Sequence, residues 1–198
     1  MPLPVGHSLI SLGIYAAYRR DGLSLNTMRS GWKTALLFVF AGLLPDVDFV
    51  TVPFLGFGSH RGFTHSFFFA FIASSFLYTF VKAIDPGTPK RLWPFLLLAS
   101  SLHPVCDFFT YDYLVERGGV MLFYPLSRSY IQSPFPVFMG IELRYLDTVL
   151  SLHTVLALLY ETVLSTVFLL TVLHLKNRLL RTAVGVAERR AYGKKIED

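Results

Sequence analysis

The sequence is poor in charged residues and cysteine, and both shortages narrow the class of protein. Charged residues make up 16% of the 198 residues, below the quarter or so usual in soluble domains, whereas hydrophobic residues make up 53%. The single cysteine, Cys106, excludes an intramolecular disulfide and a zinc site built from cysteines alone. The N-terminus has no basic region of the kind that opens a signal peptide, so we expect no cleaved leader.

The apolar residues are gathered into five blocks, most of them near the length of a membrane span. A helix needs about 20 apolar residues to cross a bilayer. The blocks are residues 3–18, 34–55, 66–84, 93–111 and 146–175. Pro45 lacks the backbone N–H that an α-helix needs, so the second block should break there. We therefore predict an all-α, multi-spanning membrane protein with about five apolar segments, one of them broken at Pro45.

The basic residues predict the orientation of these segments. Fourteen of the 18 lysines and arginines follow the first, third and fifth blocks. Cytoplasmic loops are enriched in such residues, so we expect a cytoplasmic C-terminus and an N-terminus outside the cell membrane. The chain then divides into a membrane domain, 1–175, and a basic cytoplasmic tail, 176–198. Although the net charge is +5, we find no nucleic-acid-binding motif and expect no nucleic-acid partner.

Under this topology, seven histidines and aspartates lie toward the outer face of the membrane. Ionisable side chains at this depth are costly, so each needs a partner or a task. Histidine and carboxylate together suit zinc and similar divalent ions. We therefore predict one metal site near the outer face. Its candidate ligands are His7, Asp46, Asp48, His60, His65, His103 and Asp107.

Three local patterns support this site. His103 and Asp107 share a helix face, which suits either one metal ion or a hydrogen bond between two buried groups. Asp46 and Asp48 can both point inward only if the helix unwinds after Pro45, and otherwise they form a solvated turn. Arg61 lies between His60 and His65, as an anion clamp for phosphate would, although a polar loop is the alternative.

The last apolar block adds a carboxylate and two further histidines. Glu161 lies in a stretch almost free of charge, at a depth similar to that of Asp107, so we include it among the ligands. His153 should lie at or above the outer surface, and His174 at the cytoplasmic end. The aromatic outer loop, 112–145, is interpreted as membrane anchors or as a lid that admits a lipid.

Several of these elements occur in one order and together resemble the YdjM-like family of membrane-bound metal-dependent hydrolases. They are Gly6-His7, the Leu-Leu-Pro-Asp-Val-Asp of 43–48, the His-Arg-Gly-Phe-Thr-His-Ser of 60–66, His103-x3-Asp107 followed by Thr110, and the Tyr-Pro element of 122–127. The resemblance implies the same seven site residues, and a glutamate on the last helix. Glu161 fits that role by its surroundings and Glu142 by its distance from Pro125. Phe49 departs from the pattern, since relatives often carry histidine there.

The order of ligands is also similar to that of zinc-dependent phospholipase C and the P1-type nucleases, which bind three zinc ions. The matching residues are Asp46, His60, His103, Asp107 and Glu161. This similarity implies two or three divalent ions, with zinc the expected metal.

The expected function is therefore metal-dependent hydrolysis of a phosphoester at the outer membrane interface. A metal-activated water would be the nucleophile, Asp46 or Asp48 the general base, and Arg61 the group that holds phosphate oxygens. The expected substrate is a lipid head group or another phosphorylated envelope component. The alternative is a non-catalytic protein that binds or transports a metal ion. A third interpretation is a scaffold whose basic tail contacts anionic lipid.

Overall fold

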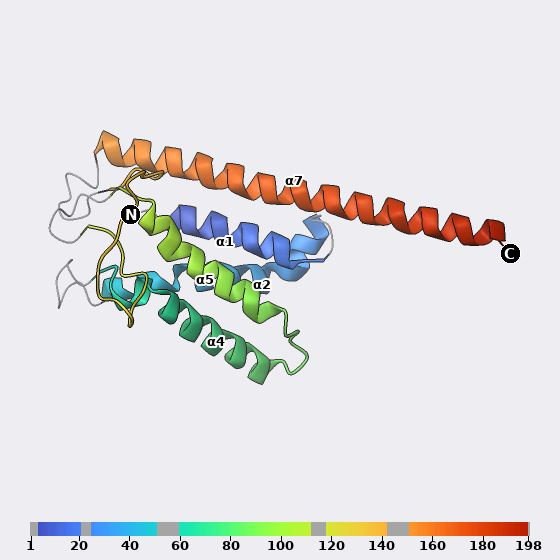
Figure 1. Ribbon diagram of the computed structural model, residues 1–198, viewed down its shortest axis with the longest axis horizontal. Helices are drawn as coiled ribbons and strands as arrows, with labels where there is room; N and C mark the ends of the chain where they lie inside the picture. The colour runs from blue at the N-terminus through green and yellow to red at the C-terminus, as the bar shows by residue number, and fades with distance from the viewer. Residues whose placement is uncertain (1–3, 21–24, 51–59, 112–117, 142–150, 198) are drawn as a thin grey trace.

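The fold is a bundle of helices in which one long helix extends beyond the others. The computed structural model describes residues 4–20, 25–50, 60–111, 118–141 and 151–197. These residues form five α-helices and two short 3-10 helices, and their only β pairing is two isolated bridges. The elements are α1 (Pro4–Tyr18), α2 (Leu25–Leu43), η1 (Leu44–Val50), η3 (Phe63–His65), α4 (Phe67–Ile84), α5 (Leu92–Phe108) and α7 (Leu152–Glu197). Figure 1 shows α7 lying along one side of the bundle.

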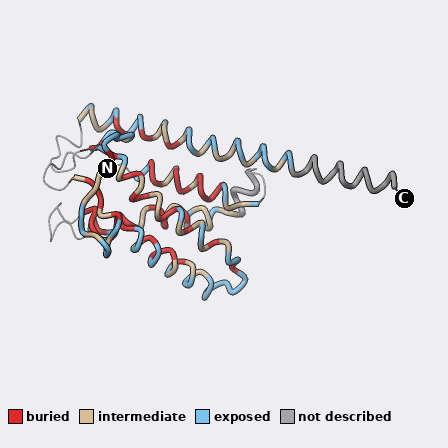
Figure 2. Tube along the Cα trace, viewed as in Figure 1, coloured by how far each residue is buried: buried red, intermediate tan, exposed pale blue. Residues whose placement is uncertain are grey.

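Helix α1 is the central element, because it contacts α2, α5 and α7. Glycine allows its close approach to α7: a Cβ atom at Gly13 would lie 2.8 Å from the ring of Phe168. An apolar core joins α1, α2, α4 and α5, with Phe38 and Leu96 completely buried. Figure 2 shows α1 buried over most of its length, whereas α7 is exposed along one side. The bundle is thus organised around its N-terminal helix.

Two described helices are long and apolar enough to cross a membrane. They are Phe67–Ile84 and Leu152–Thr182, and only 22% and 17% of their apolar windows are buried, so most of their apolar side chains face outward. Phe76 and Phe80 of α4, for example, are 67% and 55% exposed. Helix α5 is apolar but shorter. The all-α prediction holds for the described residues, but the prediction of about five spans is not confirmed.

The predicted break at Pro45 is confirmed, because α2 ends at Leu43 and the chain continues as the 3-10 helix η1. Other boundaries differ from the apolar blocks. Helix α2 begins at Leu25 instead of 34, and α5 ends at Phe108 instead of 111. Apolarity marks the part of a helix that faces core or lipid, and a helix can extend beyond that part. Residues 51–55 and 146–150 of the predicted blocks lie outside the described residues.

Helix α7 continues without a break past residue 175, where the sequence predicts the start of a basic tail. A change from apolar to basic composition does not end a helix, because lysine and arginine are good helix formers. The division into 1–175 and 176–198 therefore remains a prediction about environment and not about secondary structure.

Ser66 fixes the start of α4. Its hydroxyl accepts a hydrogen bond from the Phe69 N–H at 3.1 Å and donates to the Phe63 carbonyl at 2.6 Å. It thereby joins η3, which carries His65, to the first turn of α4. Ser66 is therefore the N-cap of α4.

We expect Ser66→Ala to destabilise the protein by about 1 kcal/mol, because it removes the N-cap of α4. Thermal unfolding of purified protein in detergent would show a lower midpoint, with Ser66→Thr closer to wild type. Ser129→Ala, on the exposed outer loop, is the control. An unchanged midpoint for Ser66→Ala would mean that the cap contributes nothing to stability.

Candidate metal centre

The predicted histidines and aspartates come together at one end of the bundle. This cluster is formed where the start of α1, the end of α5 and the two 3-10 helices meet. Its members are His7, Asp46, Asp48, His60, His65, His103 and Asp107, and the side chains named here are at most 12% exposed. Burial of so many polar groups in one place requires that they satisfy one another or hold an ion.

The histidine rings of His65 and His103 meet at the centre of the cluster. Their Nε2 atoms are 3.2 Å apart. Both atoms lie near Asp107 Oδ2, at 3.1 and 3.3 Å, and near Asp46 Oδ1, at 3.5 and 3.3 Å. Two ring nitrogens and two carboxylate oxygens therefore converge on one small volume. Histidine nitrogens and carboxylate oxygens are the donor atoms that zinc accepts.

The ring of His7 extends this group. It stacks on His103 with ring centroids 3.7 Å apart, and its Nε2 lies 3.9 Å from Asp107 Oδ1. Two sets of three residues each offer ligand atoms within 4.8 Å of one another: His7, His103 and Asp107, and Asp46, His60 and His65. The arrangement is large enough to supply ligands to more than one ion.

The carboxylates of Asp46 and Asp107 are buried without hydrogen bonds. Among the described residues, none of their four oxygens has a hydrogen-bond partner, and neither has His7 Nε2. The nearest ring nitrogens, on His65 and His103, lie 3.1 to 3.5 Å from these carboxylates, within ion-pair distance. A buried carboxylate whose oxygens accept no hydrogen bond is strongly unfavourable. A divalent cation would satisfy these atoms together, so the cluster fits a metal ion.

Hydrogen bonds fix which nitrogen of two histidines faces a ligand. His103 Nδ1 lies 2.7 Å from the Gly42 carbonyl, which only accepts, so Nδ1 holds the proton. His103 Nε2 then presents its lone pair to the cluster. His60 Nδ1 likewise lies 2.7 Å from Asp48 Oδ1. Metal-binding histidines are usually held in this way, by a carbonyl or a carboxylate on the far nitrogen.

Asp48 orients the turn that carries the histidines. Besides His60, its carboxylate accepts from the Arg61 backbone N–H at 3.1 Å and from the Thr64 hydroxyl at 2.7 Å. Asp46 and Asp48 thus contact His65 from opposite sides, at Nε2 and Nδ1 respectively. This requires the break in the α-helix that the sequence predicts at Pro45, after which the chain continues as η1. The predicted roles of Asp48 as ligand and general base remain predictions.

Arg61 brings a positive charge to the cluster. Its side chain is buried, and its guanidinium lies 3.8 Å from Asp107 Oδ1. Its backbone has a φ of 65°, in the left-handed region, and its carbonyl accepts from the Met121 N–H of the outer loop. The backbone of Arg61 is therefore bonded on both sides, to Asp48 through its N–H and to Met121 through its carbonyl.

The carboxylates around His65 change its pKa. Burial opposes protonation of His65, but Asp107, Asp46 and Asp48 outweigh the effect of burial and raise the pKa of His65 well above its ordinary value. The carboxylates thus favour a cation at this point.

Glu161 lies beside the cluster and binds α1. Its Oε1 accepts a hydrogen bond from the Gly6 N–H at 3.0 Å, and a Cβ atom at residue 6 would overlap that oxygen. A carboxylate at a helix N-terminus stabilises the free N–H groups there. Glu161 belongs to neither set of possible ligands, so its role as ligand remains a prediction.

The other candidates lie apart from the cluster or outside the described residues. His153 donates to the Gly140 carbonyl at 2.9 Å, and His174 is exposed. Glu142 lies outside the described residues. Phe49, where relatives often carry histidine, packs its ring 4.2 Å from that of His60. The sequence did not predict that the Gly42 carbonyl would hold His103 or that the Thr64 hydroxyl would donate to Asp48. Every residue has a backbone carbonyl, so residue type gives no sign of the role of Gly42.

Comparison with known proteins gives one result. The family model described as YdjM inner membrane protein matches residues 1–183, which include the whole cluster and Glu161. No curated protein and no solved structure matches the chain. The family resemblance predicted from the sequence motifs is therefore confirmed. The family's name, inner membrane protein, agrees with the two apolar helices whose side chains face outward. This chain belongs to the YdjM inner membrane protein family.

Proposed function

We propose that this protein is a membrane-embedded, metal-dependent hydrolase of phosphoesters. The observation that carries the proposal is the set of buried donor atoms without hydrogen bonds on His7, Asp46 and Asp107. Such atoms are satisfied when an ion is bound. Zinc is the metal that best suits a mixed histidine and carboxylate set. When bound, it would lower the pKa of a coordinated water to about 7 and so supply hydroxide at neutral pH.

Asp46 is the residue best placed to act on the attacking water. Its side chain is 12% exposed, against 7% or less for the other described members of the cluster. Both of its oxygens lack a described hydrogen-bond partner. One oxygen can therefore hold an ion while the other accepts a proton from water, as a general base does.

Arg61 supplies the positive charge that a phosphoester needs. A guanidinium matches the geometry of phosphate oxygens, and it remains charged at any physiological pH. Its position beside Asp107 puts this charge at the edge of the ligand set. A metal-transport pathway would gain nothing from an arginine among its ligands, since it would repel the ion. Arg61 therefore favours hydrolysis over transport.

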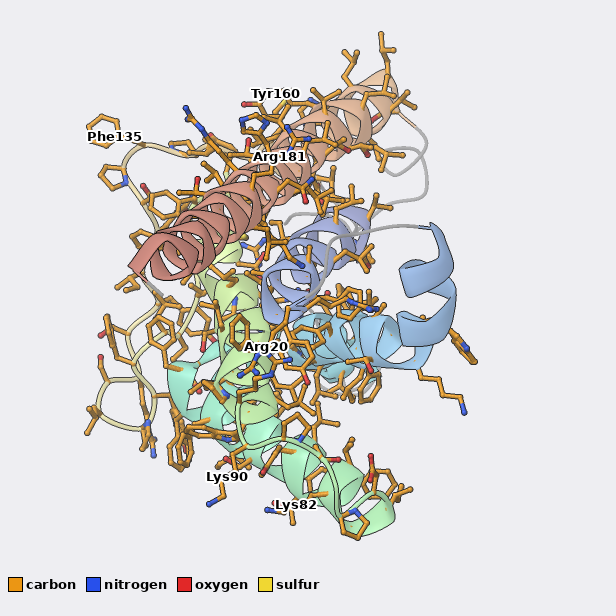
Figure 3. The ribbon with its side chains drawn as sticks, turned by 90° about the vertical axis from the view of Figure 1, so that its right-hand side faces the viewer. Arg20, Lys82, Lys90, Phe135, Tyr160 and Arg181 are labelled. Atoms are coloured by element: carbon orange, nitrogen blue, oxygen red, sulfur yellow. The ribbon has the colours of Figure 1, made fainter. Side chains whose placement is uncertain are left out.

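The outer loop supports a substrate with an apolar part. A groove of about 280 Å³ lies between this loop and α7, lined by Tyr111, Phe138 and Tyr160 among others. Leu126 and Phe135 of the same loop are 94% and 80% exposed, and Figure 3 shows Phe135 pointing away from the helices. Tyr111, which lines the groove, follows Asp107 by four residues in the sequence. We infer that the phosphoester is a lipid head group.

We further propose that the chain spans the membrane several times with the cluster near the extracytoplasmic face. In α1, α4 and α5, the ligands lie at or beside one end, and basic residues lie at or beside the other. The basic residues are Arg19 and Arg20, Lys82, and Arg91. Such residues favour the cytoplasmic side, and this preference supports a cluster on the opposite side.

A non-catalytic metal site is the second candidate, and the burial of the cluster favours it. Structural metal sites are closed, whereas catalytic ones keep a position for water. The two candidates share the same ligands. They differ in whether metal-loaded protein hydrolyses a phosphoester.

We expect the protein purified in detergent to retain at least one zinc-like ion per chain, measured by elemental analysis. The double variant His103→Ala/Asp107→Ala should lose it, because it removes donors from the centre of the cluster. His174→Ala, which is exposed and remote from the cluster, is the matched control. Absence of metal from wild type prepared with added zinc would reject both candidates.

We expect Arg61→Gln to lower kcat/KM for phosphoester hydrolysis by about 10²-fold or more, because it removes a charge that stabilises the transition state. Metal content should stay close to wild type, since Arg61 is not a ligand. Arg128→Gln, on the exposed outer loop, should leave the rate unchanged. A metal-loaded wild type that cleaves neither phospholipids nor soluble phosphodiesters would reject hydrolysis and leave the non-catalytic site.

A further inference from the structure

A second groove lies between α1, α2 and α7, away from the metal centre. Its volume is about 380 Å³, and its walls are almost entirely carbon. The lining residues include Leu12, Ala16, Trp32, Leu36, Leu169 and Leu173. Trp32 and Leu36 are 54% and 56% exposed, so the groove opens to the surroundings of the bundle. Leu169 and Leu173 belong to the apolar span Leu152–Thr182, which puts the groove at membrane depth.

Three positively charged side chains, one from each wall, lie at this groove. Lys176 of α7 donates to the Ala16 carbonyl at 2.7 Å. Arg19, just after α1, donates to the Tyr15 hydroxyl at 2.9 Å. Lys33 of α2 lies with its Nζ 5.9 Å from the centroid of the Trp32 ring. Ala16, Tyr15 and Trp32 all line the groove, so Lys176 and Arg19 hydrogen-bond to its wall and the exposed Lys33 lies beside it.

Apolar walls with cations beside them match the two parts of an anionic phospholipid. An acyl chain suits the carbon lining at membrane depth. Each lysine or arginine near the membrane surface contributes about 1 kcal/mol of attraction to anionic lipid. A neutral lipid would gain the same burial of its chain but not this attraction. The charge therefore decides which lipid is retained.

We propose that this groove is a binding site for one anionic phospholipid. Its acyl chain lies between α1, α2 and α7, and its phosphate lies beside Arg19, Lys33 and Lys176. The site is separate from the metal centre: His7 lies in the first turns of α1, whereas Ala16 and Arg19 lie at or just beyond its other end. The bound lipid bridges three helices that the apolar core only partly joins, and it is not the substrate.

The position of a tryptophan in the wall makes the proposal testable by fluorescence. The chain has two tryptophans, and the second is Trp93 of α5. Trp93→Phe therefore leaves Trp32 as the only tryptophan. This variant would be reconstituted singly into nanodiscs of unlabelled phosphatidylcholine. A minor fraction of the lipid would be brominated on its acyl chains, because bromine quenches tryptophan fluorescence on contact. This brominated lipid would have a phosphatidylglycerol head group in one sample and a phosphatidylcholine head group in the other.

We expect brominated phosphatidylglycerol to quench Trp32 about twofold more strongly than brominated phosphatidylcholine at the same mole fraction, because the cations enrich anionic lipid in the groove. When Lys33→Gln and Lys176→Gln are added to this variant, the two brominated lipids should quench Trp32 equally. Each comparison is made within one variant, which removes the direct effect of Lys33 on Trp32. The matched control is Lys82→Gln/Lys90→Gln, because Figure 3 shows both lysines at the far end of α4, away from the groove.

Equal quenching by the two lipids in the Trp93→Phe protein would overturn the proposal, since the groove would then hold bulk lipid without selection. Absence of quenching by either lipid would also overturn it, because something other than lipid would cover Trp32. Selective quenching that survives loss of both lysines would overturn the placement of the phosphate beside Lys33 and Lys176. The assay needs neither metal nor activity, so its outcome is independent of the hydrolase proposal.

Discussion

Asp46 and Asp107 carry two carboxylates that the fold removes from water without providing hydrogen-bond partners among the described residues. In an apolar bundle such groups are tolerated only if an opposite charge neutralises them. Arg61 provides one positive charge at 3.8 Å from Asp107, and the facing nitrogens of His65 and His103 provide ligand atoms. The surrounding backbone thus gathers positive charge and possible metal ligands around the two carboxylates.

Each nearby element helps to position the aspartates and histidines of the cluster. The 3-10 helix η1 lets Asp46 and Asp48 contact opposite sides of His65. The Ser66 cap joins the histidine turn to α4, and the Gly42 carbonyl holds the ring of His103. Glu161 fixes the first turn of α1, which carries His7, against α7. The ligands come from segments far apart in the sequence, and these backbone contacts hold them together.

The two ends of the bundle differ in chemistry. One end collects buried carboxylates and histidines, and the loop 118–141, which has exposed apolar side chains, bonds to the turn at Arg61. The other end collects lysines and arginines around an apolar groove. This polarity follows from the same helices, since α1, α4 and α5 each have ligands near one end and basic residues near the other. An ion at one end and an anionic lipid at the other would each offset the charge that the chain places there.

Much of the fold and of the cluster was predictable from residue type and spacing. The excess of apolar residues in blocks indicates helices, and a break at Pro45 is expected because its nitrogen has no proton to donate to the preceding turn. The four-residue spacing of His103 and Asp107 places them on one helix face regardless of context. The helix ends were less predictable, because α2 and α7 extend into polar sequence that no apolar pattern marks.

The sequence by itself determined which residues could bind a metal, because ionisable groups in apolar segments stand out by their cost, and it predicted that they lie at comparable depth. Only the tertiary structure decided which role each of these residues has. It put Asp46 and Asp107 opposite the ring nitrogens, gave Asp48 the hydrogen bonds that orient the turn, and placed Glu161 on the Gly6 N–H. These distinctions depend on distances of a few ångström between α1, η1, α5 and α7, and such distances are set by helix packing.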